Sequence, residues 1–319
     1  MTKVVAGIDI GGTFTKIGIV DQAGKVYADD SIALDAQSSI EKYLKDLEAS
    51  VRRLFDESGE NMEFAGIGIG APMGNYYSGT IEHAPNLNWG EVIPMVNMIE
   101  DRFSVPTAIT NDANAAALGE MMYGSAVDMK DFIVITLGTG LGSGIVVNGN
   151  VVYGHDGLAG ELGHVNVQPD GRHCNCGLRG CLETYVSATG IKRTVFELLA
   201  RRNDPSELRD IPFGELTAKN ISEAAERGDL IASKAFGRTG RTLGRSLANV
   251  VALLGPKAIF LLGGLANAGD LLFKPVQENL EINLLYNYKG KVEILPSGLS
   301  KGNTAVLGAA GLAWKEVLG

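Results

Sequence analysis

The chain is poor in cysteine. It has three cysteines in 319 residues, and all of them lie between Cys174 and Cys181. Such a small, odd number argues against a disulfide framework. The N-terminus lacks the apolar segment and cleavage site of a secretory signal. No apolar run reaches the length of a membrane-spanning helix, because Gly255, Pro256 and Lys257 interrupt the longest candidate. We therefore expect a cytoplasmic protein.

Basic clusters are missing as well. The net charge is −9, and the chain has no cluster of five or more Lys and Arg residues. Nucleic acids and anionic membranes attract proteins through such basic patches. We therefore expect no nucleic-acid partner and no membrane partner. The length predicts about two domains, each large enough for a substantial core.

Glycine, by contrast, is abundant, with 42 residues that cluster beside short strands. Strand patterns alternate with helical ones, and a hairpin pattern opens each half, which predicts an α/β protein with mixed sheets. The segments "GIDIGGTFTKIGIV" and "ITLGTGLGSGIVV" are both strand, glycine turn, strand. They indicate a duplicated architecture that holds a phosphate chain from both sides. An amphipathic helix is expected over 38–58, with Ser38 and Glu41 as its capping box.

The first glycine turn, "DIGGTFTK", combines several groups that suit an anion. Gly11 and Gly12 allow a tight turn with exposed N–H groups, while Thr13 adds a hydroxyl and Lys16 a cation. Asp9, just before the turn, is well placed to hold a Mg²⁺-bound water. A plain hairpin turn with a solvated lysine is the alternative. The second turn, "GTGLGSG", is more specific, because so many small residues favour the close approach of a ligand.

The cysteines follow the pattern C-x-C-x4-C, and His164 lies ten residues upstream. Three thiolates and one imidazole from Cys174, Cys176, Cys181 and His164 would make a closed tetrahedral zinc site. His173 is a rival for the fourth position, and three ordinary free thiols are the alternative to a metal. A zinc ion here would order a loop that is poor in hydrophobic residues.

Two carboxylates flank the proposed zinc ligands, and a third follows a strand. Glu161 and Glu183 would be good acceptors for the hydroxyls of a polyol, unless they are solvated surface residues. Asn111 and Asp112 stand where the strand "VPTAIT" meets an Ala-rich helix. Either could be only an N-cap. The alternative is a carboxylate at the carboxyl end of a strand that orients a hydroxyl and accepts its proton in phosphoryl transfer. The helix N-terminus would favour its ionised form.

Together the motifs "DIGGTFTK", "PNLNW", "NDANAAALGE", "LGTGLGSG", "GLAGELGH", "CNCGLRGCLE" and "LLGGLANAG" resemble the ROK family of repressors, open reading frames and kinases, and within it the bacterial glucokinases. The resemblance runs from about residue 4 to the C-terminus. It implies an actin-like ATPase (ribonuclease H-like) fold of two duplicated α/β domains with an interdomain cleft. The smaller domain would comprise 1–112 and 303–319, and the larger 113–302 with the zinc loop.

The resemblance also implies an activity. The γ-phosphate of ATP would pass to the 6-hydroxyl of a hexose, first of all glucose, in carbohydrate metabolism and glycolysis. N-acetylmannosamine and N-acetylglucosamine are the alternative acceptors. The implied cofactors are ATP, Mg²⁺ and a structural Zn²⁺, and the implied assembly is a homodimer or homotetramer.

The resemblance assigns roles to particular residues. Asp112 would be the catalytic base. The sugar hydroxyls would be held by Asn111, Asp112, Glu161, His164 and Glu183, with His164 also a zinc ligand. The phosphates would lie against Gly11, Gly12, Thr13, Lys16, Gly138, Thr139 and Gly140. Gly263 and Gly264 would lie beside the adenosine.

Two positions depart from the family pattern. Met73 in "GAPMGN" stands where a glycine is common, and Leu262 in "LLGGLA" replaces the first glycine of a run. The family also includes sugar-responsive repressors with a helix-turn-helix region before the first glycine turn. Here the first strand begins by Lys3, so DNA binding is not expected. A non-catalytic sugar-binding protein is a third possibility, but Asp112 and the two glycine turns argue against it.

Overall fold

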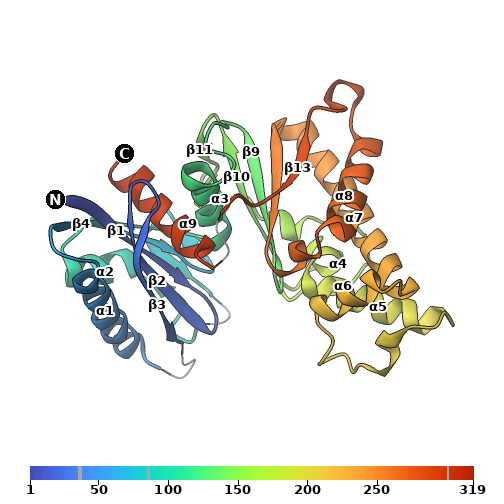
Figure 1. The fold of residues 1–319 in the computed structure, drawn as a ribbon, viewed down its shortest axis with the longest axis horizontal. Coiled ribbons are helices and arrows are strands. Elements are labelled where there is room, and N and C mark those ends of the chain that lie inside the picture. The colour runs from blue at the N-terminus through green and yellow to red at the C-terminus, as the bar shows by residue number, and fades with distance from the viewer. Residues whose placement is uncertain (35–37, 85–86, 300–301) are drawn as a thin grey trace. The chain divides into compact units, whose positions relative to one another are not determined.

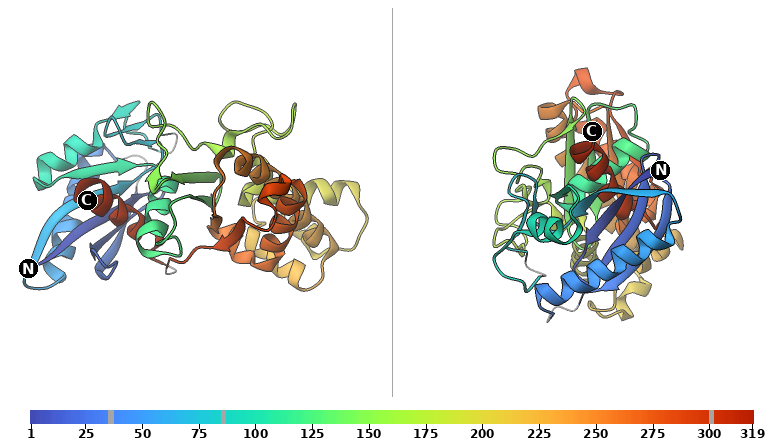
Figure 2. Two further views of the ribbon diagram at one scale, coloured as in Figure 1. Left: turned by 90° about the horizontal axis from the view of Figure 1, so that it is seen from above. Right: turned by 90° about the vertical axis from the view of Figure 1, so that its left-hand side faces the viewer.

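The structure is a computed structural model that describes residues 1–34, 38–84, 87–299 and 302–319. The first two positions of the "PNLNW" motif lie outside the described residues. The chain forms two compact units. The first comprises Met1–Lys130, Gly144–Ala159 and Gly298–Gly319, and the second Asp131–Ser143 and Gly160–Ser297. Both chain ends therefore belong to the first unit (Figure 2).

The first unit is built on a five-stranded sheet of order β3-β2-β1-β4-β8 (Figure 1). Its strands are β1 (Thr2–Ile10), β2 (Phe14–Asp21), β3 (Val26–Ala33), β4 (Met62–Gly70) and β8 (Thr107–Thr110). β1, β2 and β3 are antiparallel neighbours, whereas β1, β4 and β8 run parallel. The parallel strands therefore bring their carboxyl ends to the same edge of the sheet.

Helices cover both faces of this sheet. α1 (Ile40–Glu57) packs on one face, where alternate residues of β1 such as Ile8 join its core, and α9 (Thr304–Leu312) packs on the other, against Val5. A Cβ atom on Gly7 or Gly68 would overlap backbone atoms of α9, so the close approach of this helix depends on the two glycines.

The N-cap of α1 corrects one prediction. Ser39, and not Ser38, is the cap, and its side chain accepts a hydrogen bond from the Lys42 amide at 3.3 Å. Gly59 follows the helix with φ of 114°, as expected for a residue just beyond a helix end.

The other helices of the first unit are α2 (Met95–Phe103) and α3 (Asp112–Tyr123), and a π-helical turn (Ala313–Val317) follows α9. Its smaller strands are β5 (Gly74–Asn75), β6 (Thr80–Glu82), β7 (Val92–Ile93) and β11 (Asn150–Val151). α3 packs closely along α9, with Gly119 of one helix facing Gly308 of the other.

The second sheet has the order β11-β10-β9-β12-β13. Its remaining strands are β9 (Phe132–Leu137), β10 (Leu141–Val147), β12 (Ala258–Leu262) and β13 (Glu293–Pro296). β9, β12 and β13 are parallel, and β10 pairs antiparallel with β11. In chain order both sheets therefore read third, second, first, fourth, fifth strand. The predicted duplication of a mixed α/β architecture is confirmed.

Helices dominate the rest of the second unit. They are α4 (Glu183–Val186), α5 (Ala188–Arg201), α6 (Ala218–Glu226), α7 (Leu230–Leu254) and α8 (Asp270–Asn283). Short 3-10 turns cover Leu162–His164, Glu207–Asp210, Gly264–Ala268 and Tyr286–Tyr288. Gly240 and Gly244 of α7 lie against α8, including Pro275 within it. Along the described residues, no helix combines the length and the apolarity that crossing a membrane would require.

The predicted domain boundaries at 112 and 303 differ from the division by contacts. α3 belongs with the first unit because it packs along α9, and the first unit continues to Lys130. The segment Gly144–Ala159 also joins the first unit, because Gly144 packs against Ala113 at the start of α3.

Candidate active site

The first glycine turn connects β1 to β2. The Gly11 amide donates to the Phe14 carbonyl at 3.0 Å, and the Thr13 carbonyl accepts from the Leu34 amide at 2.7 Å. Gly12, Thr13 and Lys16 are exposed. The turn is thus fixed by its own backbone while its hydroxyl and its ammonium group face solvent.

Two carboxylates meet beside this turn. Asp9 pairs with Gly70 on the neighbouring strand, and Gly70 pairs with Thr110, two residues before Asp112. A Cβ on Gly70 would lie 3.7 Å from Asp9 Oδ1 and 3.9 Å from the Asp112 Cα atom. Burial, and then the Asp112 charge, raise the pKa of Asp9 to about 6, against the opposing effect of Lys16. The sequence motifs had not linked these carboxylates.

Asn111 and Asp112 begin α3, and Asn111 does serve as its N-cap. Its Oδ1 accepts from the Asn114 amide at 2.7 Å, which leaves the NH₂ group for a ligand. Asp112 Oδ1 accepts from the Ala113 amide at 2.8 Å. The carboxyl remains accessible to water, yet burial by surrounding protein raises its pKa more than the backbone hydrogen bonds lower it. The expected preference for the ionised form is therefore outweighed, and Asp112 is a stronger base than an ordinary aspartate.

Met73 occupies a conformation that suits glycine. Its φ is 55°, in the left-handed region that costs energy for residues with a Cβ atom. The side chain is exposed, and the Met73 carbonyl accepts from the Glu82 amide at 3.1 Å. The turn therefore keeps the shape that a glycine would give it, at some cost in backbone strain.

The second glycine turn connects β9 to β10. The Gly138 amide donates to the Gly140 carbonyl at 3.1 Å, so this turn is also very tight. Gly263 and Gly264 follow β12, the neighbour of β9 in the sheet. Gly263 has φ of 98°, and a Cβ there would lie only 2.6 Å from the Leu137 carbonyl oxygen. The two glycine segments that the resemblance assigned to the nucleotide are thus neighbours in the fold.

Glu183 lies under the second turn. Its Oε2 accepts from the Leu141 amide at 3.2 Å, and its Oε1 accepts from the Cys174 thiol at 3.0 Å. A cavity of about 120 Å³ is lined by Thr139, Gly140, Cys174 and Glu183, among others. One predicted sugar ligand and one predicted phosphate turn therefore share a cavity within the second unit.

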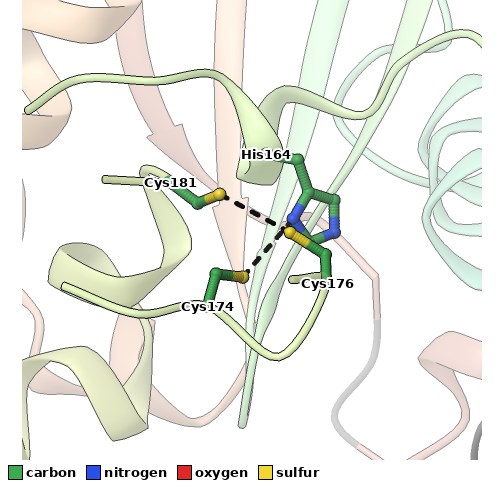
Figure 3. A group of neighbouring side chains, drawn as sticks. All are labelled: His164, Cys174, Cys176 and Cys181. Atoms are coloured by element: carbon green, nitrogen blue, oxygen red, sulfur yellow. Dashed lines mark hydrogen bonds between the residues drawn. The ribbon is translucent and has the colours of Figure 1, made fainter. Parts of the chain in front are cut away.

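The three cysteines and His164 come together as a cluster of four ligands (Figure 3). Their ligand atoms all lie within 4.8 Å of one another. Cys176 Sγ lies 3.7 Å from Cys181 Sγ, and Cys174 Sγ lies 3.7 Å from His164 Nδ1. A tetrahedral zinc site with Zn–S bonds of about 2.3 Å has ligand–ligand edges of about 3.8 Å. The donor set and its spacing therefore fit zinc, and the structure brings His164 rather than His173 to the thiols.

The orientation of His164 links the cluster to Glu161. Because Nδ1 faces Cys174, the other ring nitrogen points away from the cluster, and Nε2 lies 3.8 Å from Glu161 Oε2. Glu161 itself is exposed. A metal-bound imidazole is commonly oriented by a carboxylate at its second nitrogen. His164 can thus serve a metal with one nitrogen and a polar ligand with the other.

Arg172 supports the metal loop, and the sequence analysis missed it. Its guanidinium donates to Glu197 at 2.9 Å and to the carbonyls of Thr184 and Gly190 at 2.6 and 3.0 Å. It also lies over the ring of Tyr185, 4.6 Å from the centroid. These contacts attach the loop to α4 and α5 independently of a metal. No local signal marks this role, because an arginine beside glycine and cysteine looks like a surface residue.

Two sheets of the same strand order, each with a glycine turn between its first two strands and with packed helices, define the actin-like ATPase fold. The ROK family matches residues 5–316. The chain belongs to this family.

Individual members of the family are similar to this chain over most of its length. A glucokinase of Halalkalibacterium halodurans is 38% identical over 279 residues, covering 86% of this chain and 84% of the relative. The structure of a ROK family glucokinase from Streptomyces griseus, in complex with glucose and AMPPNP, has a TM-score of 0.80 and 32% identity, covering 98% of this chain and 99% of that one. An N-acetylglucosamine repressor of Escherichia coli is 29% identical over 318 residues, covering 98% of this chain but 75% of the repressor.

Proposed function

We propose that the chain is an ATP-dependent hexose kinase that phosphorylates glucose at its 6-hydroxyl. The observation that carries the proposal is the pair of Asp9 and Asp112, which lie together at the edge of the first sheet beside an exposed glycine turn. A base next to a phosphate-binding turn is what phosphoryl transfer to a hydroxyl requires. The similarity to glucokinases, one of them in complex with glucose and an ATP analogue, supports glucose as the acceptor.

In the first unit, Asp112 acts as the base. The 6-hydroxyl oxygen forms a bond to the γ-phosphorus as the bond to the ADP oxygen breaks, and Asp112 takes the hydroxyl proton. Its raised pKa suits this role, because a stronger base accepts the proton more readily. Asp9 would hold a water bound to the Mg²⁺ that accompanies ATP, and that ion would neutralise phosphate charge. Gly11, Gly12, Thr13 and Lys16 contact phosphates.

In the second unit, Glu161 and Glu183 accept hydrogen bonds from the sugar hydroxyls, and His164, whose Nδ1 would bind the zinc, donates its Nε2–H to a hydroxyl oxygen. Gly138, Thr139 and Gly140 contact phosphates, with Gly263 and Gly264 beside the adenosine. Asn111 of the first unit contributes its remaining NH₂ group to the sugar. These roles follow the pattern of the family and agree with the exposure of Glu161 and of Thr139.

We also propose a structural zinc ion held by His164, Cys174, Cys176 and Cys181. The edges of 3.7 Å within this cluster support it. Zinc would hold the loop and keep the thiols deprotonated. Cys174 as a thiolate has no proton to donate to Glu183, so the Glu183 carboxylate would accept from a sugar hydroxyl instead.

The test is ADP release in the presence of Mg²⁺-ATP and each of three sugars: glucose, N-acetylmannosamine and N-acetylglucosamine. We expect the highest kcat/KM with glucose. Asp112→Asn should lower kcat by at least about 10²-fold, the usual contribution of a general base. Asp29→Asn, which removes the same charge from an exposed position of β3, should have no effect.

Each other outcome has a definite meaning. A strong preference for an acetylated sugar would make the protein an N-acetylhexosamine kinase with the same machinery. Binding of sugar without ADP release would make it a sugar-binding protein. Near-normal turnover by Asp112→Asn would refute the role of that residue.

A further inference from the structure

The second unit contains a second cavity, and none of the residues that line it is among those proposed to bind the sugar, the nucleotide or the metal. It measures about 190 Å³ and lies between α5 and α7. Its walls are formed by Arg172, Tyr185, Thr194, Glu197, Arg238, Arg241 and Thr242. At this volume the cavity is smaller than the sites that hold drug-sized ligands, which start at about 300 Å³. It suits a small ligand.

The charge of this cavity is opposite to that of the protein. Three arginines and one glutamate line it, which leaves a net positive charge in a chain of net charge −9. The glutamate, Glu197, is bound by Arg172 at 2.9 Å. Arg172 also donates to Thr194 Oγ1 at 2.9 Å and is thereby fixed in the wall. The positive charge of Arg238 and Arg241 is thus not neutralised by the cavity itself.

Arg238 and Arg241 are the main source of positive charge in the cavity. They are three residues apart on α7, so they share one face of the helix. Both are exposed, and among the described residues neither guanidinium has a carboxylate within 4.0 Å or a hydrogen-bond acceptor. The hydroxyls nearby are already engaged, because Thr242 donates to the Arg238 carbonyl at 3.0 Å and Thr194 to that of Gly190 at 3.1 Å. The free donors of the cavity therefore include the two guanidinium forks.

Paired guanidinium groups suit a tetrahedral oxyanion such as phosphate, because each fork can bind two of its oxygens. We propose that this cavity binds the dianion of phosphate or of a small phosphate monoester between Arg238 and Arg241. Arg172 and Tyr185 close the wall behind it. The site is independent of the kinase function proposed above.

Isothermal titration calorimetry with inorganic phosphate, glycerol 3-phosphate and sulfate tests the site without any assay of activity. The variants are Arg238→Ala and Arg241→Ala, singly and together, and the control for each single variant is Arg245→Ala, which also removes one positive charge. Arg245 lies on the same helix, is exposed like the others and does not line the cavity. Thermal melting of each variant checks that it is folded.

We expect phosphate binding that is at least about tenfold weaker in the double variant and unchanged in Arg245→Ala, because charge-assisted hydrogen bonds to the ligand are lost only in the former. Binding of glycerol 3-phosphate as tight as that of phosphate would identify esters as ligands, and weaker binding would identify free phosphate. Equal weakening in the single variants and in Arg245→Ala would reveal general surface charge and overturn the site. Absence of binding, or binding that the double variant retains, would overturn it too.

Discussion

The raised pKa of Asp9 makes a prediction about stability that does not depend on catalysis. Burial and the neighbouring Asp112 charge raise this pKa from 3.8 to about 6. The folded state therefore favours the protonated carboxyl, and the stability that it contributes at low pH is lost as the pH rises through about 4 to 6. At about 1.4 kcal/mol per pH unit, the full loss is about 3 kcal/mol.

Asp9→Asn should abolish this loss, because an amide is neutral at every pH. Near pH 4 the variant and the natural protein should melt at similar temperatures. Above about pH 7 the variant should be more stable by up to about 3 kcal/mol, which corresponds to roughly 6–12 °C for a domain of the size of the first unit. Differential scanning calorimetry in magnesium-free buffer, at intervals from pH 4 to 8, measures the difference.

A control and a ligand complete the experiment. Asp29→Asn, which removes one carboxylate from an exposed position of the same sheet, is the control. Mg²⁺ should raise the melting temperature of the natural protein at pH 7.5 and should have little effect on Asp9→Asn, because the ion favours the ionised carboxylate. The reasoning fails if Asp9→Asn stabilises equally at pH 4.5 and 7.5, or if it destabilises at pH 7.5.

Two further predictions concern the metal loop and the contact of Gly68 with α9. The purified protein should contain about one zinc per chain by mass spectrometry. Cys176→Ser should lose most of this zinc, whereas the matched control Asn175→Ser should keep it. A natural protein with far less than one zinc per chain would contradict the site. Chelation should abolish sugar binding, followed by calorimetry, before the whole chain unfolds. Gly68→Ala should lower the melting temperature by several degrees, because its Cβ would overlap the Ala309 carbonyl. Gly237→Ala in α7 meets no atom within 4 Å and should raise stability by up to about 1 kcal/mol. Equal effects of the two substitutions would show that the contact between the first sheet and α9 tolerates a methyl group.

Most of the fold could be predicted from local sequence patterns. The hairpin at each glycine turn, α1, α3 and the helical stretch of the second unit follow from periodicity and turn residues within a few positions of one another. The sequence analysis did not predict β3, because Asp29 and Asp30 disfavour a strand in isolation. Neighbouring strands override that preference, as they often do. The N-cap of α1 was predicted one residue too early, at Ser38 instead of Ser39, because two adjacent serines offer equivalent capping signals.

In the candidate site, too, contacts between residues far apart in sequence could not be predicted. The cysteine cluster was predictable because its spacing along the chain already restricts its geometry. The meeting of Asp9 with Asp112 was not, because it depends on the order of three parallel strands that are far apart in sequence. Arg172 was missed for a related reason. Its partners Glu197 and Gly190 are brought to it only when α5 packs beside the loop.

The discontinuity of the first unit has a consequence for synthesis on the ribosome. The unit needs α9, whose residues fill one face of its sheet, and α9 follows the whole of the second unit along the chain. At about 5–20 residues per second, the intervening segment between Lys130 and Gly298 takes on the order of 10–30 s to synthesise. During that time the Gly7 and Gly68 face of the sheet is uncovered in the nascent chain. The second unit can complete itself first, and truncation of the last helix would leave an exposed sheet that is open to association with other chains.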